Sequence, residues 1–162
     1  MSIAIRCPAR GFTLIELLVT LAVTALLATM VVPLAQVTLQ RQHEQELRRA
    51  LREIRTAIDA YKQATDQGRI QRAIDSTGYP KSLNTLVDGV EDTRDPKKAK
   101  IYFLRRIPRD PLYTDYRVPD ADTWGKRSYA SEPSDPQEGA DVYDVFSTST
   151  AIGLNGIPYR RW

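Results

Sequence analysis

The sequence predicts an α+β protein, in which a long N-terminal α-helix, first transmembrane and then amphipathic, packs on a small C-terminal antiparallel β-sheet with long loops. Three observations lead to this prediction. An apolar run follows a short basic segment, a charged segment with an apolar stripe at helical spacing comes next, and the second half alternates brief apolar runs with turn residues.

Residues 12–32 form an apolar run in which Glu16 is the only ionisable residue. As an α-helix, these 21 residues would measure roughly 31 Å, which is enough to cross the hydrocarbon layer of a bilayer. A carboxylate in such a segment costs roughly 2.5–3.5 kcal/mol on insertion scales, so it normally has a partner. We expect a transmembrane helix over residues 12–39, with a kink at Pro33, which removes one backbone hydrogen bond.

Residues 1–11 precede this run and are basic, with two arginines and no apolar core. A conventional secretory signal has its apolar region before a cleavage site with small residues. Here the apolar run comes after Gly11. A conventional signal peptide or a plain signal anchor therefore leaves Gly11, Phe12 and Glu16 unexplained.

Residues 11–18 read Gly-Phe-Thr-Leu-Ile-Glu-Leu-Leu, which resembles the processing motif of type IV pilins and type II secretion pseudopilins. The resemblance implies that residues 1–11 are a leader peptide, that a prepilin peptidase cuts after Gly11 on the cytoplasmic side, and that Phe12 becomes the N-methylated first residue. It also implies that the helix of residues 12–39 forms the core of a filament. A proline at the place of Pro33 matches this family too.

Such a cut would leave a helix that starts with a charged amine, one helical turn before Glu16. We hypothesise that Glu16 pairs with the Phe12 amine of a neighbouring subunit, which would offset the burial of two charges and fix the axial register between helices. The alternative is a Glu16 side chain that only reaches toward the cytoplasmic interface.

Residues 40–74 are expected to continue the helix as a charged, amphipathic segment. Spacings of four and three residues draw one apolar stripe along it. A coiled-coil partner is one interpretation, but only about two clean heptads are present, which favours packing against the chain's own domain. Gly68 is a candidate stop, and the boundary at 74 allows one further turn. The stripe consists of Leu47, Leu51, Ile54, Ile58 and Tyr61, widened by Ala50, Ala57 and Ala64.

Residues 75–162 are expected to form a globular α+β domain, which the resemblance places in the periplasm. Apolar residues at helical spacing predict a short helix over residues 81–87. Strand character appears over residues 127–130 and 142–147. Between these strands, residues 132–139 form a proline-containing acidic loop.

Four short stretches of this domain resemble, in their order, those of the major pseudopilins of type II secretion systems, and the similarity is greatest to the G type. The lack of a cysteine pair near the C-terminus agrees, because many type IV pilins close a loop there. The stretches are Tyr79-Pro80, the Ile-Pro-Arg-Asp-Pro of residues 107–111, Trp124-Gly125 and the Tyr-Asp-Val-Phe-Ser of residues 143–147.

The resemblance also raises the question of calcium, which major pseudopilins bind in the loop after the last strand. No Asp or Glu follows Asp144 in this chain. Calcium sites need several hard oxygen ligands, usually including carboxylates. We therefore expect no cofactor and no metal, and the acids from which a calcium site could be rebuilt are Asp135, Glu138 and Asp141.

The composition argues against catalysis and against binding of nucleic acid. Without the two leader arginines, 21 basic residues face 20 acidic ones, so the formal net charge falls from +3 to +1. His43 is the only histidine, Cys7 is the only cysteine and lies in the leader, and neither has catalytic partners. We therefore expect no enzymatic activity, and we expect the aromatic-basic tail of residues 159–162 to dock on its own domain or on a neighbouring subunit.

The resemblance implies a structural subunit of a pilus-like filament, the pseudopilus of a type II protein secretion system. The chain would be a single-pass protein of the bacterial inner membrane before assembly into a periplasmic filament. Its partners would be copies of itself, minor pseudopilins, the prepilin peptidase and the inner-membrane assembly platform. The alternative is a type IV pilus subunit, or a minor pilin that acts as a tip or binding module toward DNA or a surface.

Overall fold

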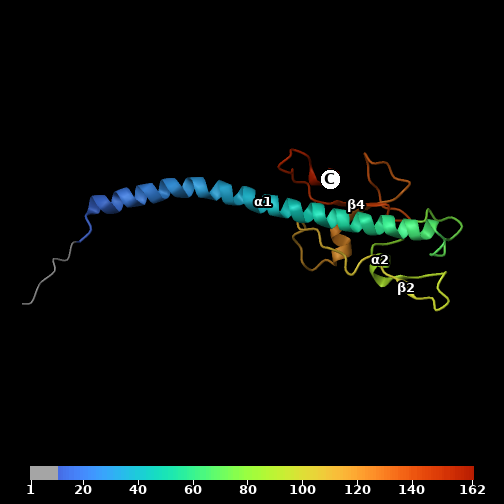
Figure 1. Ribbon diagram of the computed structural model, residues 1–162. Coiled ribbons are helices and arrows are strands. Elements are labelled where there is room, and N and C mark those ends of the chain that lie inside the picture. Colours follow the sequence, from blue (N-terminus) through green and yellow to red (C-terminus); the bar gives the residue numbers. More distant parts are fainter. Residues whose placement is uncertain (1–10) are drawn as a thin grey trace, which may run out of the picture. The chain divides into compact units, whose positions relative to one another are not determined.

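The computed structural model describes residues 11–162, except that the side chains of residues 30–34 are outside the description. The expected leader of residues 1–11 therefore lies outside the described residues apart from Gly11. The chain divides into two compact units, Met1–Gln40 and Arg41–Trp162. The long helix α1, Leu14–Asp66, contributes to both units (Figure 1).

In the first unit, the backbone of α1 is helical without a break, including position 33. The side chain of Pro33 is not among the described ones, so the kink expected there stays a prediction. Three threonines of this segment donate their hydroxyl groups to carbonyl oxygens one turn earlier: Thr20 to Leu17 at 3.0 Å, Thr24 to Thr20 at 2.6 Å and Thr29 to Leu26 at 2.7 Å. These hydroxyls therefore need no partner outside the helix.

The apolar side chains of this segment are exposed in the single chain. Judged on the described residues alone, no helix combines the length and the apolar character that crossing a membrane requires. The exposed side chains include Leu14, Ile15, Leu17, Leu18, Val19, Leu21, Val23, Leu26 and Leu27.

In the second unit, the expected apolar stripe of α1 is buried in the core. Leu47, Ile54 and Ile58 are inaccessible or nearly so, and the three alanines that widen the stripe are buried with them. Tyr61 is partly buried and packs edge-on against Phe103, with ring centroids 5.3 Å apart. The stripe therefore packs against the chain's own domain, as expected, and offers no seam for a coiled-coil partner.

The helix ends at Asp66, before the expected boundary at residue 74, and the additional turn does not form. Gly68 has a φ of 71°, and Arg69 and Gly68 donate their N–H groups to the carbonyl oxygens of Ala64 and Thr65, both at 2.9 Å. This is the Schellman arrangement, which satisfies the last free carbonyls of a helix and turns the chain away from its axis. The predicted stop at Gly68 is confirmed.

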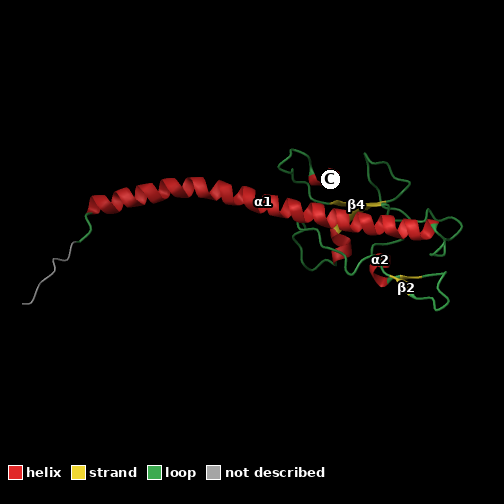
Figure 2. Cartoon of the chain, in the orientation of Figure 1, coloured by secondary structure: helices red, strands yellow, loops and turns green. Residues whose placement is uncertain are grey.

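The domain after the helix contains, in its described residues, two separate two-stranded antiparallel sheets instead of one (Figure 2). Strand β1, Val90–Glu91, pairs with β2, Lys100–Ile101, and β3, Trp124–Arg127, pairs with β4, Asp144–Ser147. A short helix α2, Asn84–Asp88, confirms the prediction over residues 81–87 with a shift of its start, and two short 3₁₀ helices are η1, Asp120–Thr123, and η2, Tyr159–Arg161. The α+β class is confirmed.

Strand β3 begins three residues earlier than the strand expected over residues 127–130. The indole of Trp124 is buried and its Nε1 donates to the carbonyl of Pro108 at 2.7 Å. At the next position, an added Cβ on Gly125 would overlap the ring of Phe146 across the ladder. These two tertiary contacts fix the strand where local propensity alone favours the later residues.

The four short stretches that resembled the major pseudopilins are joined to one another in the structure. The Val142 N–H donates to the carbonyl of Pro80 at 2.8 Å. The buried Asp110 carboxylate accepts the Ser147 hydroxyl at 2.6 Å and the Leu112 N–H at 2.8 Å, while burial raises the pKa of the Asp110 carboxyl above its usual value. Residues 79–80, 107–111, 124–125 and 143–147 thus form one connected part of the domain around β3 and β4.

Candidate functional site

Two places in the chain combine functional and structural interest, one in each unit. The first is the segment Gly11–Glu16 at the start of the described chain. The second is the part of α1 in the second unit that holds the C-terminal residues. Each is described by itself.

The segment before α1 is exposed and has no regular secondary structure. Gly11, Phe12 and Thr13 precede the first helical residue, and the Phe12 side chain is 77% exposed. A Cβ added at Gly11 would meet nothing within 4 Å, and Gly11 is not among the glycines with positive φ. The fold therefore does not require glycine at position 11, and any such requirement comes from another molecule.

Glu16 lies in the first turn of α1 and takes part in capping the start of that helix. The Thr13 Oγ1 accepts the Glu16 N–H at 3.3 Å, and the Glu16 Oε2 accepts the Thr13 N–H at 3.5 Å. This reciprocal arrangement is a capping box, which the Thr-x-x-Glu spacing at the start of an apolar run can predict. It holds the carboxylate beside the peptide group that links Phe12 to Thr13, so an amine made at Phe12 would form next to a negative charge.

In the second unit, Glu44 is a buried carboxylate at the head of the apolar stripe of α1. Glu44 is only 7% exposed, and its Oε1 accepts the Leu154 N–H at 2.6 Å and the Tyr159 hydroxyl at 3.0 Å. A buried charge is tolerated where hydrogen-bond donors satisfy it. Glu44 therefore ties the helix to residues that lie 110 and 115 positions later in the chain.

Arg55 lies about three helical turns after Glu44 and holds the same C-terminal region from a second point. Its Nε donates to the Asp144 carboxylate at 2.7 Å, and its Nη2 donates to the carbonyls of Val145 at 3.0 Å and Trp162 at 2.8 Å. One guanidinium thus links α1, β4 and the last residue of the chain. We call Glu44, Arg55 and their partners the C-terminal clasp.

The aromatic-basic tail completes the clasp. The Arg48 guanidinium lies 4.4 Å from the centroid of the Trp162 ring, and the rings of Tyr159 and Trp162 meet edge-on at 4.9 Å. The Trp162 Nε1 donates to the carbonyl of Ile157 at 3.2 Å. The expectation that this tail docks on its own domain is confirmed.

The sequence interpretation missed Glu44, although a signal was present. Glu44 lies three residues before Leu47, so it falls on the apolar stripe instead of the charged face. A carboxylate in the register of a buried stripe indicates a polar partner inside the fold. The partners themselves, Leu154 and Tyr159, could not be read from the helix.

The three acids considered for a rebuilt calcium site have other partners or none. The Asp141 carboxylate accepts the hydroxyl of Thr77 and the Tyr129 N–H, the latter at 2.9 Å, and the Asp135 Oδ1 accepts the Gln137 Nε2 at 2.9 Å. Glu138 is exposed. Across the described part of the chain, no three His, Cys, Asp or Glu side chains gather in a way that could hold a metal ion.

Comparisons with known proteins confirm the resemblance seen in the sequence. Residues 6–32 match the family model of the prokaryotic N-terminal methylation motif. The chain is similar to the type II secretion system core protein G of Klebsiella michiganensis, with 26% identity over 82% of this chain and 88% of that protein. The core protein G of Pectobacterium carotovorum subsp. carotovorum is 28% identical over 82% of this chain and 80% of its own length. The core protein G of Pseudomonas aeruginosa is 27% identical over 83% of this chain and 90% of its own length. No solved structure matches the chain.

The clasp predicts a specific effect of Glu44 on stability. Glu44→Ala leaves the Leu154 N–H and the Tyr159 hydroxyl without their acceptor, so we expect the free energy of unfolding to fall by about 1–3 kcal/mol. Glu46→Ala is the matched control, because Glu46 is exposed on the same helix. Urea unfolding measures the difference, and limited proteolysis should show earlier cleavage within residues 148–162 only for Glu44→Ala. Equal stability of the two variants would contradict the role of Glu44.

Proposed function

We propose that this chain, which carries the prokaryotic N-terminal methylation motif and is similar to type II secretion system core proteins G over most of its length, is a structural subunit of a pseudopilus. The observation that carries the proposal is the placement of the motif. It contains the exposed residues Gly11 and Phe12 directly before a helix whose apolar side chains are exposed in the single chain.

The exposed apolar helix supports a membrane-anchored precursor. Fully burying a Leu, Val, Ile or Phe side chain is worth roughly 1.5–3 kcal/mol. Either lipid or neighbouring helices can supply that burial, so the same surface serves an inner-membrane precursor and an assembled filament. The domain of residues 41–162 would then face the periplasm.

The partners follow from this life cycle. A prepilin peptidase would cut after Gly11 and methylate Phe12, the inner-membrane platform would add the processed chain to the filament, and minor pseudopilins would share it. The function would come from assembly and movement of the filament, so no catalytic residue is proposed.

Glu16 is proposed to act between subunits. Its capping box holds the carboxylate at the start of its own helix, where proteolysis would create the Phe12 amine. When a neighbouring helix stacks at the right height, the carboxylate can pair with the neighbour's amine, and only that height satisfies both charges inside an apolar bundle. The pair would therefore set the register of the filament.

Processing is the first test. When the full chain is co-expressed with a prepilin peptidase, mass spectrometry should find a mature protein that begins with N-methylated Phe12. Gly11→Val should stay uncut, because the side chain would block the peptidase while the fold tolerates it. An inactive peptidase is the control, and a product that still begins at Met1 would contradict the proposal.

Assembly tests the role of Glu16. Glu16→Ala should be processed normally, but its filament yield should fall by about tenfold or more, because each stacked amine would lack its partner. A tenfold loss corresponds to about 1.4 kcal/mol of pairing free energy. Thr13→Ala is the informative control, since it removes the Oγ1 of the capping box and keeps the carboxylate. If Thr13→Ala assembles as poorly as Glu16→Ala, the carboxylate acts through capping of its own helix and not through a neighbour.

We further propose that the domain does not depend on calcium. The loop after β4 has no carboxylate, and the carbonyl oxygen of Trp162 already accepts a hydrogen bond from the Arg55 Nη2. The thermal midpoint Tm should therefore be the same in calcium and in a chelator. A clear rise of Tm with calcium would contradict this, and Asp135→Asn, Glu138→Gln and Asp141→Asn would then identify the ligands.

A further inference from the structure

A groove on the second unit carries an excess of positive charge. It has a volume of about 940 Å³ and lies between the exposed side of α1 and the segment after β2. Its basic residues are two arginines of α1 and two of the loop, and Glu53 is its only acid, so the net charge of the lining is +3. The arginines are Arg49, Arg52, Arg105 and Arg106.

These four arginines have no anionic partner in the described part of the chain. All four are exposed, and none takes part in any of the ion pairs or side-chain hydrogen bonds formed there. Other arginines of the domain are engaged: Arg55 with Asp144, Arg69 with Asp92 and Arg109 with Asp120. The groove is thus a cluster of cations that the fold itself does not neutralise.

The complementary charge lies on the acidic loop of residues 132–139. Glu132, Asp135 and Glu138 are exposed, and no Lys or Arg lies within the loop. None of the three forms an ion pair in the described residues, although Asp135 shares a surface hollow with Arg160 and Arg161. The three carboxylates give the loop a charge of −3, which equals the groove's excess in magnitude.

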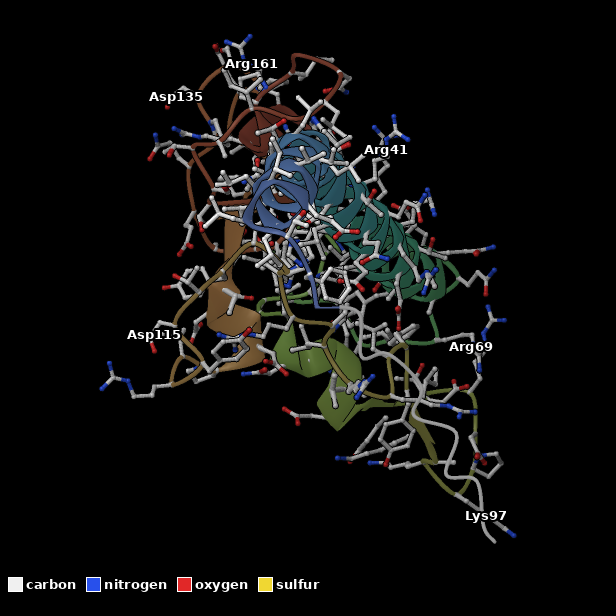
Figure 3. The ribbon with its side chains drawn as sticks, turned by 90° about the vertical axis from the view of Figure 1, so that its left-hand side faces the viewer. Arg41, Arg69, Lys97, Asp115, Asp135 and Arg161 are labelled. Carbon is white, nitrogen blue, oxygen red and sulfur yellow. The ribbon has the colours of Figure 1, made fainter. Side chains whose placement is uncertain are left out.

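No ion pair links the groove to the loop in the described part of the chain. Figure 3 shows Asp135 and Arg41 on opposite sides of α1. Arg52 lies eleven residues, about three turns, after Arg41 and so on the same helix face. Arg52 also lines a hollow with Arg161, and Arg161 shares another hollow with Asp135, so the cationic Arg161 borders both surfaces.

We propose that the groove of Arg49, Arg52, Arg105 and Arg106 receives the acidic loop, residues 132–139, of a second copy of this chain. Two different, complementary surfaces of one subunit make a heterologous contact, which repeats from copy to copy and builds an open helical filament when the rotation does not close. Apolar atoms of Ala57, Ala60 and Phe103 line the groove between the charges and would pack against the loop's prolines.

This inference rests on the proposed function, which supplies many copies at high local concentration. It adds a second contact to the helix core, one between the domains, that selects the neighbour by charge. Because exposed charges are screened over about 8–10 Å at physiological salt, the contact favours correct encounter more than it adds affinity.

Cysteine cross-linking tests the contact directly. In a Cys7→Ser background, the full chain carrying Arg106→Cys and Asp135→Cys is expressed with the assembly machinery and oxidised. A ladder of disulfide-linked multimers is expected, while each single cysteine gives no ladder. The control pair Arg106→Cys with Asp115→Cys, which uses an exposed acid of another loop, should give none either.

Charge reversal tests the energetics. Arg105→Glu with Arg106→Glu should reduce filament yield by about tenfold or more, because like charges then meet across the contact. Adding Glu132→Lys, Asp135→Lys and Glu138→Lys in the same chain should restore the yield. A merely destabilised fold would not be rescued by these distant substitutions.

The outcomes separate the two proposals. Processed, filament-forming wild type with no ladder and no effect of charge reversal overturns the docking inference and leaves the pseudopilus function intact. Loss of binding to anionic vesicles in Arg105→Glu, Arg106→Glu with unchanged filament yield assigns the groove to a lipid surface and also overturns it. A wild type that is neither cut nor assembled overturns the function, and the inference falls with it.

Discussion

The apolar surface of the first half of α1 is the constraint on which the rest of this protein depends. Nine large apolar side chains between Leu14 and Leu27 are exposed in the single chain, and patches of that extent in water lead to association. The polar groups of the same segment are already satisfied locally, the threonine hydroxyls by carbonyls of the helix and the Glu16 carboxylate by the Thr13 N–H. The surface that remains for a neighbouring molecule to cover is therefore mostly apolar, and Glu16 is the only ionisable residue of residues 12–32.

The second half of the same helix packs inside its own domain. Its stripe is buried by its own domain, and Glu44 and Arg55 extend from the helix to hold the C-terminal residues. The first part of α1 therefore leaves its apolar side chains exposed for contact with other molecules, and the second part belongs to the core of the domain. Charge-assisted hydrogen bonds thus tie the C-terminal residues of the domain to the helix.

Local sequence patterns predicted those features of the fold whose physical cause is also local. The stripe from Leu47 to Ile58 and the stop at Gly68 follow from helical spacing and from a glycine that accepts positive φ, and both were correct. The candidate processing residues Gly11 and Phe12 and the candidate register residue Glu16 come from a linear motif, and their roles stay predictions. The start of β3 at Trp124 was missed, because it depends on the Pro108 carbonyl, and the partners of Glu44 were missed because they lie more than a hundred residues away.

Different constraints act on the glycines at positions 11, 68 and 125. Gly68 has a φ of 71°, and a Cβ at Gly125 would overlap the ring of Phe146, so the fold itself favours glycine at both positions. Gly11 has empty space around it and an ordinary backbone conformation. In a lineage that lost its peptidase, position 11 would be free to drift to other amino acids while positions 68 and 125 stayed glycine, and that contrast would date the loss of the machine from sequences alone.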